Sequence, residues 1–346
     1  MSPKTQIFIL GATGYIGGGV LERLLQHRTA STSQITALVR NAAKIPLLAS
    51  TGVKTVFGTL DNVALIERQA SESDVVFACA DSDHVESCEA ILRGLKKRYE
   101  VTGTIPVFVH TSGTDILNDN VEGMYSSDTI WDDTDLDQLE RLPDTDPHRL
   151  TDPLVIAADE DGYARTHIVL PSTIYDFATG QLVDLGIRKP RSIEIPKLTD
   201  VSITRKRAGM VGLGLNTWSN VHIDDIGELY IVLYNAILDG RAGHGREGLY
   251  FGENGESVVR AMSERIGEAL VACGVSRPGE QTPTSFGEMD YARPENEHLR
   301  AWYGSNSRCK ANRARELGWK PKHTTEDMLK SIRGEVEWQL KHKTST

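Results

Sequence analysis

Short apolar segments alternate with amphipathic ones over the first half of the chain. The apolar segments lack strict alternation of polar and apolar positions, a pattern typical of strands that are buried on both faces of a parallel sheet. The segments between them repeat apolar residues at a spacing of three and four, as helices do. This order predicts an α/β fold with a doubly wound parallel sheet of the Rossmann type. We expect strands at 6–10, 35–39, 54–57, 74–80, 106–110 and 164–170, and helices at 15–26 and 87–99.

The regular alternation fades after residue 175. Helix patterns return over 221–238, 258–273 and 325–340, whereas the stretch 187–207 contains prolines and is locally basic. We expect that stretch to be a loop or a substrate-facing flap. The change of pattern predicts a smaller C-terminal substrate-binding region beside the nucleotide core. The expected core comprises 1–175 and 216–253, and the expected substrate-binding region comprises 176–215 and 254–346.

A glycine-rich turn follows the first expected strand and opens the first expected helix. Glycines at 11, 14 and 17 permit a tight turn and let the backbone approach a pyrophosphate, while the helix N-terminus offers free N–H groups and a partial positive charge. In this strand–turn–helix setting the motif predicts dinucleotide binding. The expected contacts are Gly11, Thr13, Gly14, Tyr15, Ile16 and Gly17.

The charge after the second expected strand indicates which dinucleotide is bound. An NAD site usually places a carboxylate on the ribose about 20 residues after the glycines. Here neither Asp nor Glu occurs between Glu22 and Asp61, and Arg40 stands at the end of the strand with Lys44 one turn further on. A guanidinium there can make a bidentate contact to a 2′-phosphate. We therefore predict NADP as the cofactor in preference to NAD.

Composition excludes several classes of partner. Lys and Arg total 38 and Asp and Glu total 48, so the net charge is −10 and neither a general nucleic-acid binder nor a protein docked on an anionic membrane is expected. No run approaches the ~20 apolar residues of a membrane span. The four cysteines show no C-x-x-C spacing, so we expect no zinc site, no disulfide framework and a cytoplasmic location. The pattern gives no indication of the oligomeric state.

One acidic stretch interrupts the first half of the chain. Residues 128–146 contain eight Asp and Glu residues and a single basic residue, Arg141. A divalent-metal loop is one interpretation, but the stretch lacks the Asp-x-Asp-x-Asp-Gly pattern of such loops. We therefore expect a solvated surface excursion.

Several motifs occur in a characteristic order along nearly the whole chain. They are FILGATGYIGG at 8–18, ALVRN at 37–41, GTLDN at 58–62, HTSGT at 110–114, LPSTIYD at 170–176, NVHIDDIGELY at 220–230 and ARELGWKP at 314–321. In this combination the chain resembles the extended and atypical branch of the short-chain dehydrogenase/reductase superfamily. Within that branch it is similar to the NAD-dependent epimerase/dehydratase-like proteins, including fungal members.

The resemblance implies positions for further cofactor contacts and a smaller substrate region. Leu60 and Asp61 are implied near the adenine, Cys79 and Ala80 along the cofactor, and Thr111 and Ser112 on the nicotinamide side. Residues 171–173 are implied beside the carboxamide: Pro171, Ser172 and Thr173. His222, Asp224 and Asp225 match a helix start of the family, and we interpret them as structural rather than as metal ligands.

The usual catalytic pair of the superfamily is missing. Its members use a Ser with a Tyr and a Lys in a Y-x-x-x-K spacing, in which the ammonium lowers the pKa of the phenol. This chain has no lysine between Lys97 and Lys189, and Thr129 stands where Tyr125 would need a lysine. Ser112 remains at the place of the family serine, and the segment starting at His148 occupies the region where the pair often falls. We take Tyr125 and His148 as candidate proton donors and Ser112 as the group that orients the substrate.

These observations predict an NADP-dependent oxidoreductase that acts on a small carbonyl- or imine-type metabolite without the Tyr–Lys pair. Reduction needs a proton donor, so a phenol with an ordinary pKa or an imidazole is compatible with that direction. Two alternatives stay open. The protein could bind NADP and catalyse a non-redox step, or it could be a redox-sensing regulatory protein on the same fold.

Overall fold

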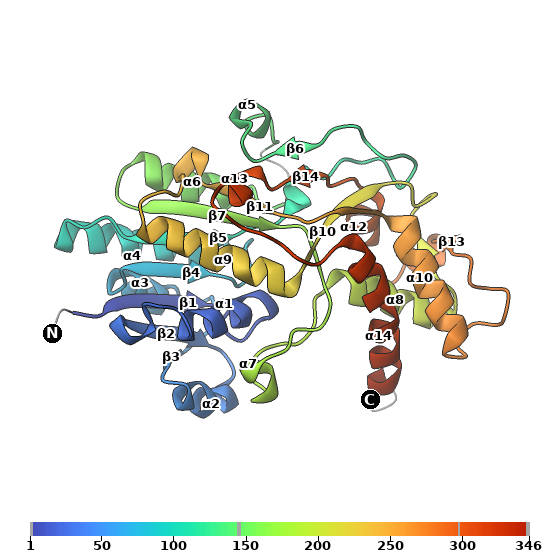
Figure 1. Ribbon diagram of the computed structural model, residues 1–346, viewed down its shortest axis with the longest axis horizontal. Helices are drawn as coiled ribbons and strands as arrows, with labels where there is room; N and C mark the ends of the chain where they lie inside the picture. The colour runs from blue at the N-terminus through green and yellow to red at the C-terminus, as the bar shows by residue number, and fades with distance from the viewer. Residues whose placement is uncertain (1–2, 144–146, 297, 344–346) are drawn as a thin grey trace.

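The computed structural model describes residues 3–143, 147–296 and 298–343. Its main feature is a seven-stranded sheet in which all neighbouring strands are parallel, in the order β11-β7-β5-β4-β1-β2-β3 (Figure 1). This order is that of a Rossmann-type sheet and confirms the fold predicted from the sequence. The strands are β1 (Thr5–Leu10), β2 (Ser33–Val39), β3 (Lys54–Phe57), β4 (Val75–Ala78), β5 (Val107–Thr111), β7 (Arg165–Pro171) and β11 (Leu249–Gly252).

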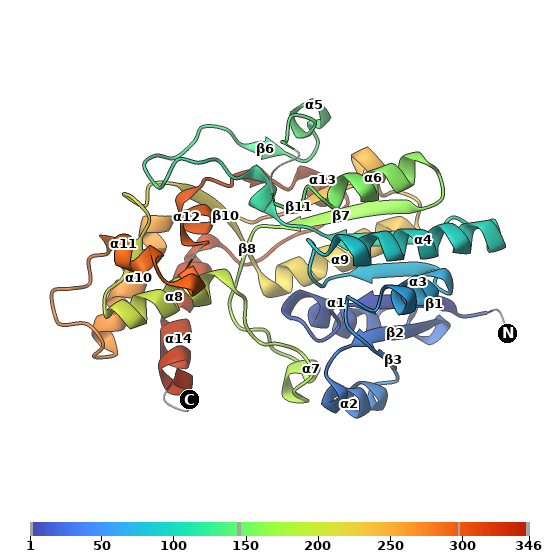
Figure 2. The same ribbon diagram turned by 180° about the vertical axis from the view of Figure 1, so that it is seen from behind.

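Helices cover both faces of this sheet. Helices α1 (Tyr15–Leu25) and α9 (Ile223–Leu238) pack together on the face seen in Figure 1. Figure 2 shows α3 (Val63–Ser71), α4 (Val85–Thr102) and α6 (Asp152–Glu160) on the opposite face. Because both faces are covered, the central strands are largely apolar, and Phe8, Phe77 and Phe108 are fully buried in them. A short helix, α2 (Ile45–Ser50), follows β2.

A smaller region lies beside the carboxyl ends of the strands (Figures 1 and 2). Its sheet has the order β12-β10-β8, with β8 (Thr173–Tyr175), β10 (Thr217–His222) and β12 (Glu256–Val258). Helices α8 (Glu194–Arg205), α10 (Val259–Ala272) and α14 (Thr325–Lys343) pack against one another and enclose a second hydrophobic cluster, which is separate from the cluster around the main sheet. The division of the chain into core and substrate-binding segments stays a prediction. Leu182 and Trp319 belong to the expected substrate-binding segments but pack with the first cluster.

The remaining elements are short. The strands among them are β6 (Trp131–Asp132), β9 (Gly209–Met210), β13 (Thr284–Ser285) and β14 (Cys309–Lys310). The α-helices are α5 (Leu136–Leu139), α7 (Gln181–Asp184), α11 (Glu288–Tyr291), α12 (Leu299–Gly304) and α13 (Asn312–Glu316). The 3-10 turns are η1 (Ala30–Thr32), η2 (Ala42–Lys44), η3 (Thr114–Leu117), η4 (Gly245–Glu247) and η5 (Pro294–Asn296). Among the described residues no helix combines the length and apolar character that crossing a bilayer requires.

One expectation for the second half of the chain is wrong, and one expected helix begins two residues later. The stretch 187–207, expected to be a loop or flap, contains the twelve-residue helix α8. Pro196 is compatible with it because a proline in the first turn interrupts no helical hydrogen bond, and Ile195, Leu198 and Val201 are buried on one side. The helix expected from residue 221 begins at Ile223, since the two residues before it end β10.

The acidic stretch 128–146 is not wholly a solvated excursion. Asp133 is fully buried and accepts hydrogen bonds from the backbone N–H groups of Phe251 and Arg313. Burial raises the pKa of the Asp133 carboxyl to about 7, although the hydrogen bonds from the two N–H groups lower it. This carboxyl therefore joins the stretch to β11 and α13. Asp144 and Asp146 lie outside the described residues.

We predict that Gly11→Ala destabilises the fold far more than Gly52→Ala. Both glycines have a positive φ, +80° and +86°, so each substitution costs about 1 kcal/mol of backbone strain. A Cβ at Gly11 would lie 2.2 Å from the carbonyl oxygen of Cys79, whereas nothing lies within 4 Å of a Cβ at Gly52. We expect the overlap at Gly11 to add a further loss of about 2 kcal/mol. Denaturant titration of the two variants measures this difference in unfolding free energy. Equal losses for the two variants would contradict the close contact.

Candidate functional site

The glycine turn has the geometry that an anionic ligand requires. The N–H of Gly14 donates to the carbonyl oxygen of Gly11 at 2.8 Å, and α1 begins one residue later. A Cβ at Gly17 would lie 2.3 Å from the Gly11 oxygen, so the helix packs closely on the turn. The first turn of α1 contains no acidic residue and no side chain caps it. Its free N–H groups and the helix dipole therefore face outward and can bind a phosphate.

Other residues of the turn hold the structure together. The buried Tyr15 hydroxyl donates to the carbonyl oxygens of Tyr175 and Asp176, at 3.0 and 2.6 Å. Burial raises the pKa of this phenol well above its ordinary value, so it stays protonated as a donor. Thr13 accepts a backbone hydrogen bond from Lys189 at 3.1 Å, and Ile16 packs against the main core. Thr13 and Tyr15 thus connect the turn to the chain that follows β8.

A group of cations lies beside the turn. Arg40 is exposed at the end of β2, and Nζ of Lys44 donates to the carbonyl oxygen of Ile187 at 2.6 Å. Burial lowers the pKa of Lys44, and the positive charges of Lys189 and Arg40 lower it further. Lys189 is a residue that the sequence did not single out as part of the site. A bound anion at this position would reduce the electrostatic repulsion among these positive charges.

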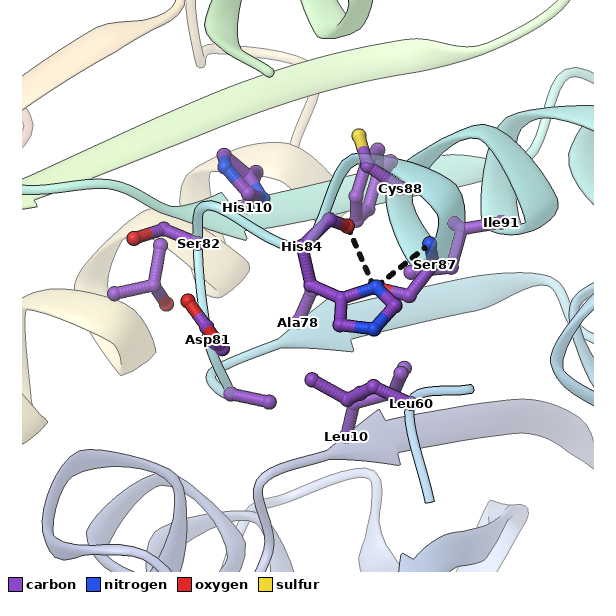
Figure 3. A pocket seen from close by; sticks show the side chains of 13 residues that line it. Leu10, Leu60, Ala78, Asp81, Ser82, His84, Ser87, Cys88, Ile91 and His110 are labelled. Carbon is purple, nitrogen blue, oxygen red and sulfur yellow. Dashed lines mark hydrogen bonds between the residues drawn. The ribbon is translucent and has the colours of Figure 1, made fainter. Parts of the chain in front are cut away.

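A pocket lies between the ends of β1, β4 and β5 and the start of α4 (Figure 3). His84 accepts a hydrogen bond from the N–H of Ser87 at 3.2 Å through Nδ1, and its Nε2 lies 3.3 Å from a carboxylate oxygen of Asp61. That contact lowers the pKa of the Asp61 carboxyl. Leu60 lines the pocket where the resemblance implies the adenine, and Asp61 sits at its rim. The pocket is lined by Leu10, Leu60, Ala78, Ala80, Asp81, Ser82, His84, Ser87, Cys88, Ile91, Phe108, His110 and Thr111.

The strand ends implied to contact the cofactor lie at one edge of the sheet. Cys79 follows β4 and is buried, which raises the pKa of its thiol to about 12. The hydroxyl of Thr111, at the end of β5, lies 2.6 Å from that of Tyr230. Ser172 donates through both its N–H and its hydroxyl to Gly252, between Pro171 and Thr173. These contacts place the implied residues together at the carboxyl ends of the strands, where ligands of such sheets bind.

Ser112 belongs to a buried polar network. Its hydroxyl donates to Oδ2 of Asp152 at 2.8 Å, and the other carboxylate oxygen lies 3.5 Å from Nε2 of His110. Burial raises the pKa of Asp152 to about 6 and lowers that of His110 to about 4. Asp152 starts helix α6, so an acidic residue occupies the segment in which the superfamily carries its Tyr and Lys. The sequence singled out Ser112 but not this partner.

His148 lies next to the same network. It has a positive φ of +64°, unusual for a non-glycine residue, and Nδ1 lies 2.8 Å from a carboxylate oxygen of Asp83 and 3.0 Å from the hydroxyl of Ser82. Burial alone would lower the pKa of His148, but the carboxylate of Asp83 raises it above its ordinary value. A Cβ on Gly113, the residue after Ser112, would lie 3.0 Å from Nε2 of His148. The structure therefore brings Ser112 and His148 to the same place.

Tyr125 lies apart from these groups. It is 58% exposed, in the connection between η3 and β6, and its carbonyl oxygen accepts from the side-chain amide of Asn306 at 3.3 Å. The next residue, Ser126, contacts the hydroxyl of Thr217 at 2.9 Å. Within the described part of the chain, the Tyr125 phenol makes no hydrogen bond to Ser112 or His148.

A second pocket adjoins the site on the side of the smaller region. Burial raises the pKa of Glu194, at the start of α8, to about 7, and the charge of Asp115 raises it further. Sequence analysis did not single out Glu194, because its segment was interpreted as a loop or flap. The pocket is lined by Thr173, Glu194, Ile195, Leu198, Trp218, Val259, Met262, Trp302 and Tyr303.

The acidic helix start after β10 is structural. Nδ1 of His222 accepts from the N–H of Asp224 at 3.1 Å and thereby caps α9. The carboxylate of Asp225 accepts from the N–H groups of Lys322 and His323 at 3.0 and 2.8 Å. Among the residues that the structure describes, no group of three His, Cys, Asp or Glu side chains is arranged to hold a metal ion.

Comparison with known proteins identifies relatives at the level of family and fold. The family model described as "NmrA-like family" matches residues 3–132. The chain is 29% identical to the oxidase ucsJ of Acremonium sp over 333 residues, 91% of this chain and 92% of that protein. It is 28% identical to a phenylcoumaran benzylic ether reductase of Pinus taeda over 138 residues, 38% of this chain and 43% of that protein.

Solved structures share the architecture. A dTDP-glucose 4,6-dehydratase of Bacillus anthracis, determined in complex with NAD, superposes with a TM-score of 0.65 at 16% identity and covers 98% of each chain. At this identity the likeness shows the fold. Together with the NmrA-like match, it confirms the resemblance to the extended short-chain dehydrogenase/reductase superfamily that the sequence motifs indicated.

We predict that Asp152→Asn stabilises the protein increasingly as the pH rises from about 4 to 7. The folded-state pKa of this carboxyl, about 6, lies above its ordinary value of 3.8, so the folded state binds the proton more tightly than the unfolded state. The stability that this proton provides is present at low pH and is lost as the pH rises towards 6. The variant has no such loss. Relative to the wild type it should gain up to about 3 kcal/mol of unfolding free energy across this range.

Denaturant titrations at several pH values measure that difference. Asp128→Asn, which removes an exposed carboxyl, is the matched control and should differ little from the wild type at every pH. A difference between Asp152→Asn and the wild type that stays constant with pH would show that the buried carboxyl does not titrate as described.

Proposed function

We propose that this chain is an NADP(H)-dependent oxidoreductase that acts on a small carbonyl- or imine-type metabolite. The observation that carries the proposal is the uncapped N-terminus of α1 beside the cations Arg40, Lys44 and Lys189. A pyrophosphate fits the first feature, and a 2′-phosphate fits the second. The names of the relatives, an oxidase and a reductase, agree with redox chemistry.

The chain offers a contact for each part of the cofactor. The turn at Gly11 would hold the pyrophosphate, since it leads directly into the N-terminus of α1, which has neither a side-chain cap nor an acidic residue in its first turn. Leu60 and His84 would enclose the adenine, with the 2′-phosphate on the three cations. Thr111, Ser172 and Thr173 would lie on the nicotinamide side, because Thr111 ends β5, Ser172 follows β7 and Thr173 starts β8. When bound, the cofactor supplies the hydride at its nicotinamide C4.

The residues around Ser112 supply the polar chemistry that the Tyr–Lys pair supplies elsewhere in the superfamily. Ser112 is held by Asp152 at 2.8 Å and would orient the substrate oxygen or nitrogen. His148 is held by Asp83, whose carboxylate raises the pKa of the imidazole, so the protonated ring can give a proton to a developing alkoxide. This arrangement favours His148 over Tyr125 as the proton donor, since among the described residues the Tyr125 phenol makes no hydrogen bond to Ser112, Asp152 or His148.

Cofactor preference is tested by Arg40→Ala. We expect the wild type to bind NADPH more tightly than NADH, and the variant to lose roughly 10- to 100-fold in NADPH affinity because a charge-assisted contact to the 2′-phosphate is gone. Affinity for NADH should not change. The measurement is fluorescence titration of both cofactors, with Lys54→Ala as a control that removes an exposed cation from the neighbouring strand. An unchanged preference for NADPH in Arg40→Ala would show that Arg40 does not bind the 2′-phosphate.

Turnover is tested by NADPH consumption over a panel of aldehydes, ketones and cyclic imines. With a neutral carbonyl substrate, we expect His148→Gln to lower kcat about 100-fold, because a proton donor of suitable pKa is lost. Tyr125→Phe should stay within about 3-fold of the wild type, and Ser112→Ala should lower kcat/KM while NADPH affinity stays unchanged. A large loss in Tyr125→Phe would reverse the assignment of the donor. If no member of the panel consumes bound NADPH, the oxidoreductase proposal fails.

A further inference from the structure

The hydroxyl of Ser112 has a single hydrogen, and Asp152 competes with the substrate for it. Oγ of Ser112 lies 2.8 Å from Oδ2 of Asp152, a distance that suits a hydrogen bond in either direction. An ionised carboxyl can only accept, so Ser112 must then donate its hydrogen to Asp152. A carbonyl oxygen and the nitrogen of a neutral imine are acceptors too. Ser112 therefore cannot donate to such a substrate while it donates to an ionised Asp152.

The carboxyl of Asp152 has few other polar partners. Asp152 is 1% exposed, and its second oxygen, Oδ1, makes no hydrogen bond within the described part of the chain. Oδ1 lies 3.5 Å from Nε2 of His110, which is 3% exposed and has no hydrogen bond at either ring nitrogen. A buried carboxylate normally accepts several hydrogen bonds or forms a close ion pair. Among the described residues Ser112 alone donates to this carboxyl, so its surroundings favour the neutral acid.

The end of β5 fixes the relative positions of these groups. His110 and Ser112 are two residues apart, so their side chains lie on the same face of the sheet. Thr111, between them, contacts Tyr230 of α9 and therefore lies on the other face. The face of His110 and Ser112 is the one that α4 and α6 cover, and Asp152 is the first residue of α6 (Figure 2). The fold thus holds Asp152 next to Ser112 and out of contact with solvent.

The charges around Asp152 are of both signs. Burial raises its pKa most, the charges of His148 and Arg149 lower it, and that of Asp83 raises it further. Burial also lowers the pKa of His110, so a protonated Asp152 beside a neutral His110 is the favoured state at mildly acidic pH. The groups that act on Asp152, or on His148 beside it, are these two residues themselves with His110, Arg149, Asp83, Asp115 and Cys88.

We propose that Asp152 is a positioning residue for Ser112 and that the reactive form of the protein carries a proton on Oδ2 of Asp152. In this form the hydrogen bond is reversed. The carboxyl donates to Oγ of Ser112, and the hydroxyl hydrogen of Ser112 is released to the substrate oxygen or nitrogen. An N–H at Nε2 of His110 would face Oδ1 and keep the carboxyl proton on the oxygen next to Ser112. The inference rests on the proposed function and specifies the charge state in which Ser112 acts.

The proton on Asp152 is not consumed in the reaction. As negative charge develops on the substrate oxygen, the Ser112 hydroxyl donates a hydrogen bond to it, and His148 supplies the proton as proposed above. The carboxyl that donates to Ser112 polarises this hydroxyl and strengthens its hydrogen bond to the substrate. An ionised Asp152 would instead place a like charge behind the developing alkoxide.

The charge state and the direction of the hydrogen bond are tested on the full chain without cofactor or substrate. The infrared difference spectrum between the wild type and Asp152→Asn should contain the C=O band of a protonated carboxyl at about pH 5, and the band should disappear towards pH 8. Ser112→Ala should shift the band to higher frequency, because the carboxyl loses the acceptor to which it donates. Asp128→Asn, which removes an exposed carboxyl, is the matched control and should leave the band unchanged.

Two infrared results would overturn the inference, whatever the substrate is. If no band of a protonated carboxyl is lost in Asp152→Asn, Asp152 is ionised over the whole range. If Ser112→Ala leaves the band in place, the carboxyl does not donate to Ser112.

The consequence for turnover is tested by the pH profile of kcat/KM for a neutral carbonyl substrate of the panel. Asp152→Asn retains a donor next to Ser112 at every pH, because its amide N–H replaces the carboxyl O–H. The variant should equal the wild type at about pH 5 and exceed it about 10-fold at pH 7, one unit above the pKa of about 6. His148 titrates in both proteins and cancels from this ratio. A loss by the same factor at every pH would indicate a structural role and contradict the inference.

A double variant tests whether Ser112 transmits the effect. In the background of Ser112→Ala, Asp152→Asn should change kcat/KM by less than about 2-fold at any pH, because the two residues act as one unit. An undiminished effect in this background would overturn the positioning role. If no substrate consumes NADPH, the oxidoreductase proposal fails, whereas the infrared result still decides the state of Asp152. If a carbonyl substrate is reduced and the profile of Asp152→Asn parallels that of the wild type, the oxidoreductase stands and the inference fails.

Discussion

The close packing of the glycine turn against β4 is the constraint on which the site depends. Because Gly11 has no Cβ, its backbone can lie against the carbonyl of Cys79, and α1 can begin immediately after the turn. That position aims the helix N-terminus at the edge of the sheet where β4, β5 and β7 end. Every other cofactor contact that we propose is defined relative to this edge. A Cβ at Gly11 would push the turn away from β4 and would move the N-terminus of α1 away from the strand ends.

The same turn also connects the nucleotide core to the smaller region. Tyr15 donates to the end of β8, Thr13 accepts from Lys189, and the Arg188 guanidinium donates to the carbonyl of Tyr15 at 3.0 Å. The stem of Arg188 lies on Gly18, where a Cβ would approach to 2.4 Å. The chain that follows β8 is thus fastened to the turn before it enters α8, at whose start Glu194 lies. The position of α8 is therefore coupled to the geometry of the glycine turn.

Sequence patterns predict the parts of this structure that depend on local rules. The glycine turn, Arg40 and the six expected strands follow from spacing and periodicity, whereas β11, which has the same length as β3 and β4, was not expected. The pairings at the candidate site join distant residues: Ser112 with Asp152, His148 with Asp83, and Lys189 with Lys44. No period or motif encodes such pairs, because they arise only when the strands are placed side by side. Glu194 was missed for a related reason, since its helix is recognisable mainly through the partners that bury it.

The distribution of charge separates the proposed cofactor site from the rest of this acidic chain. The net charge of −10 does not describe that site, because charge acts over short distances in a protein and is screened beyond about 10 Å. Arg40, Lys44 and Lys189 lie where we propose that a 2′-phosphate binds, and an anion there would reduce the repulsion that lowers the pKa of Lys44. At the polar network of the candidate site the balance is reversed, since the carboxylate of Asp83 raises the pKa of His148. One acidic chain can therefore offer cations to an anionic cofactor and, at another position, a carboxylate that favours a charged proton donor.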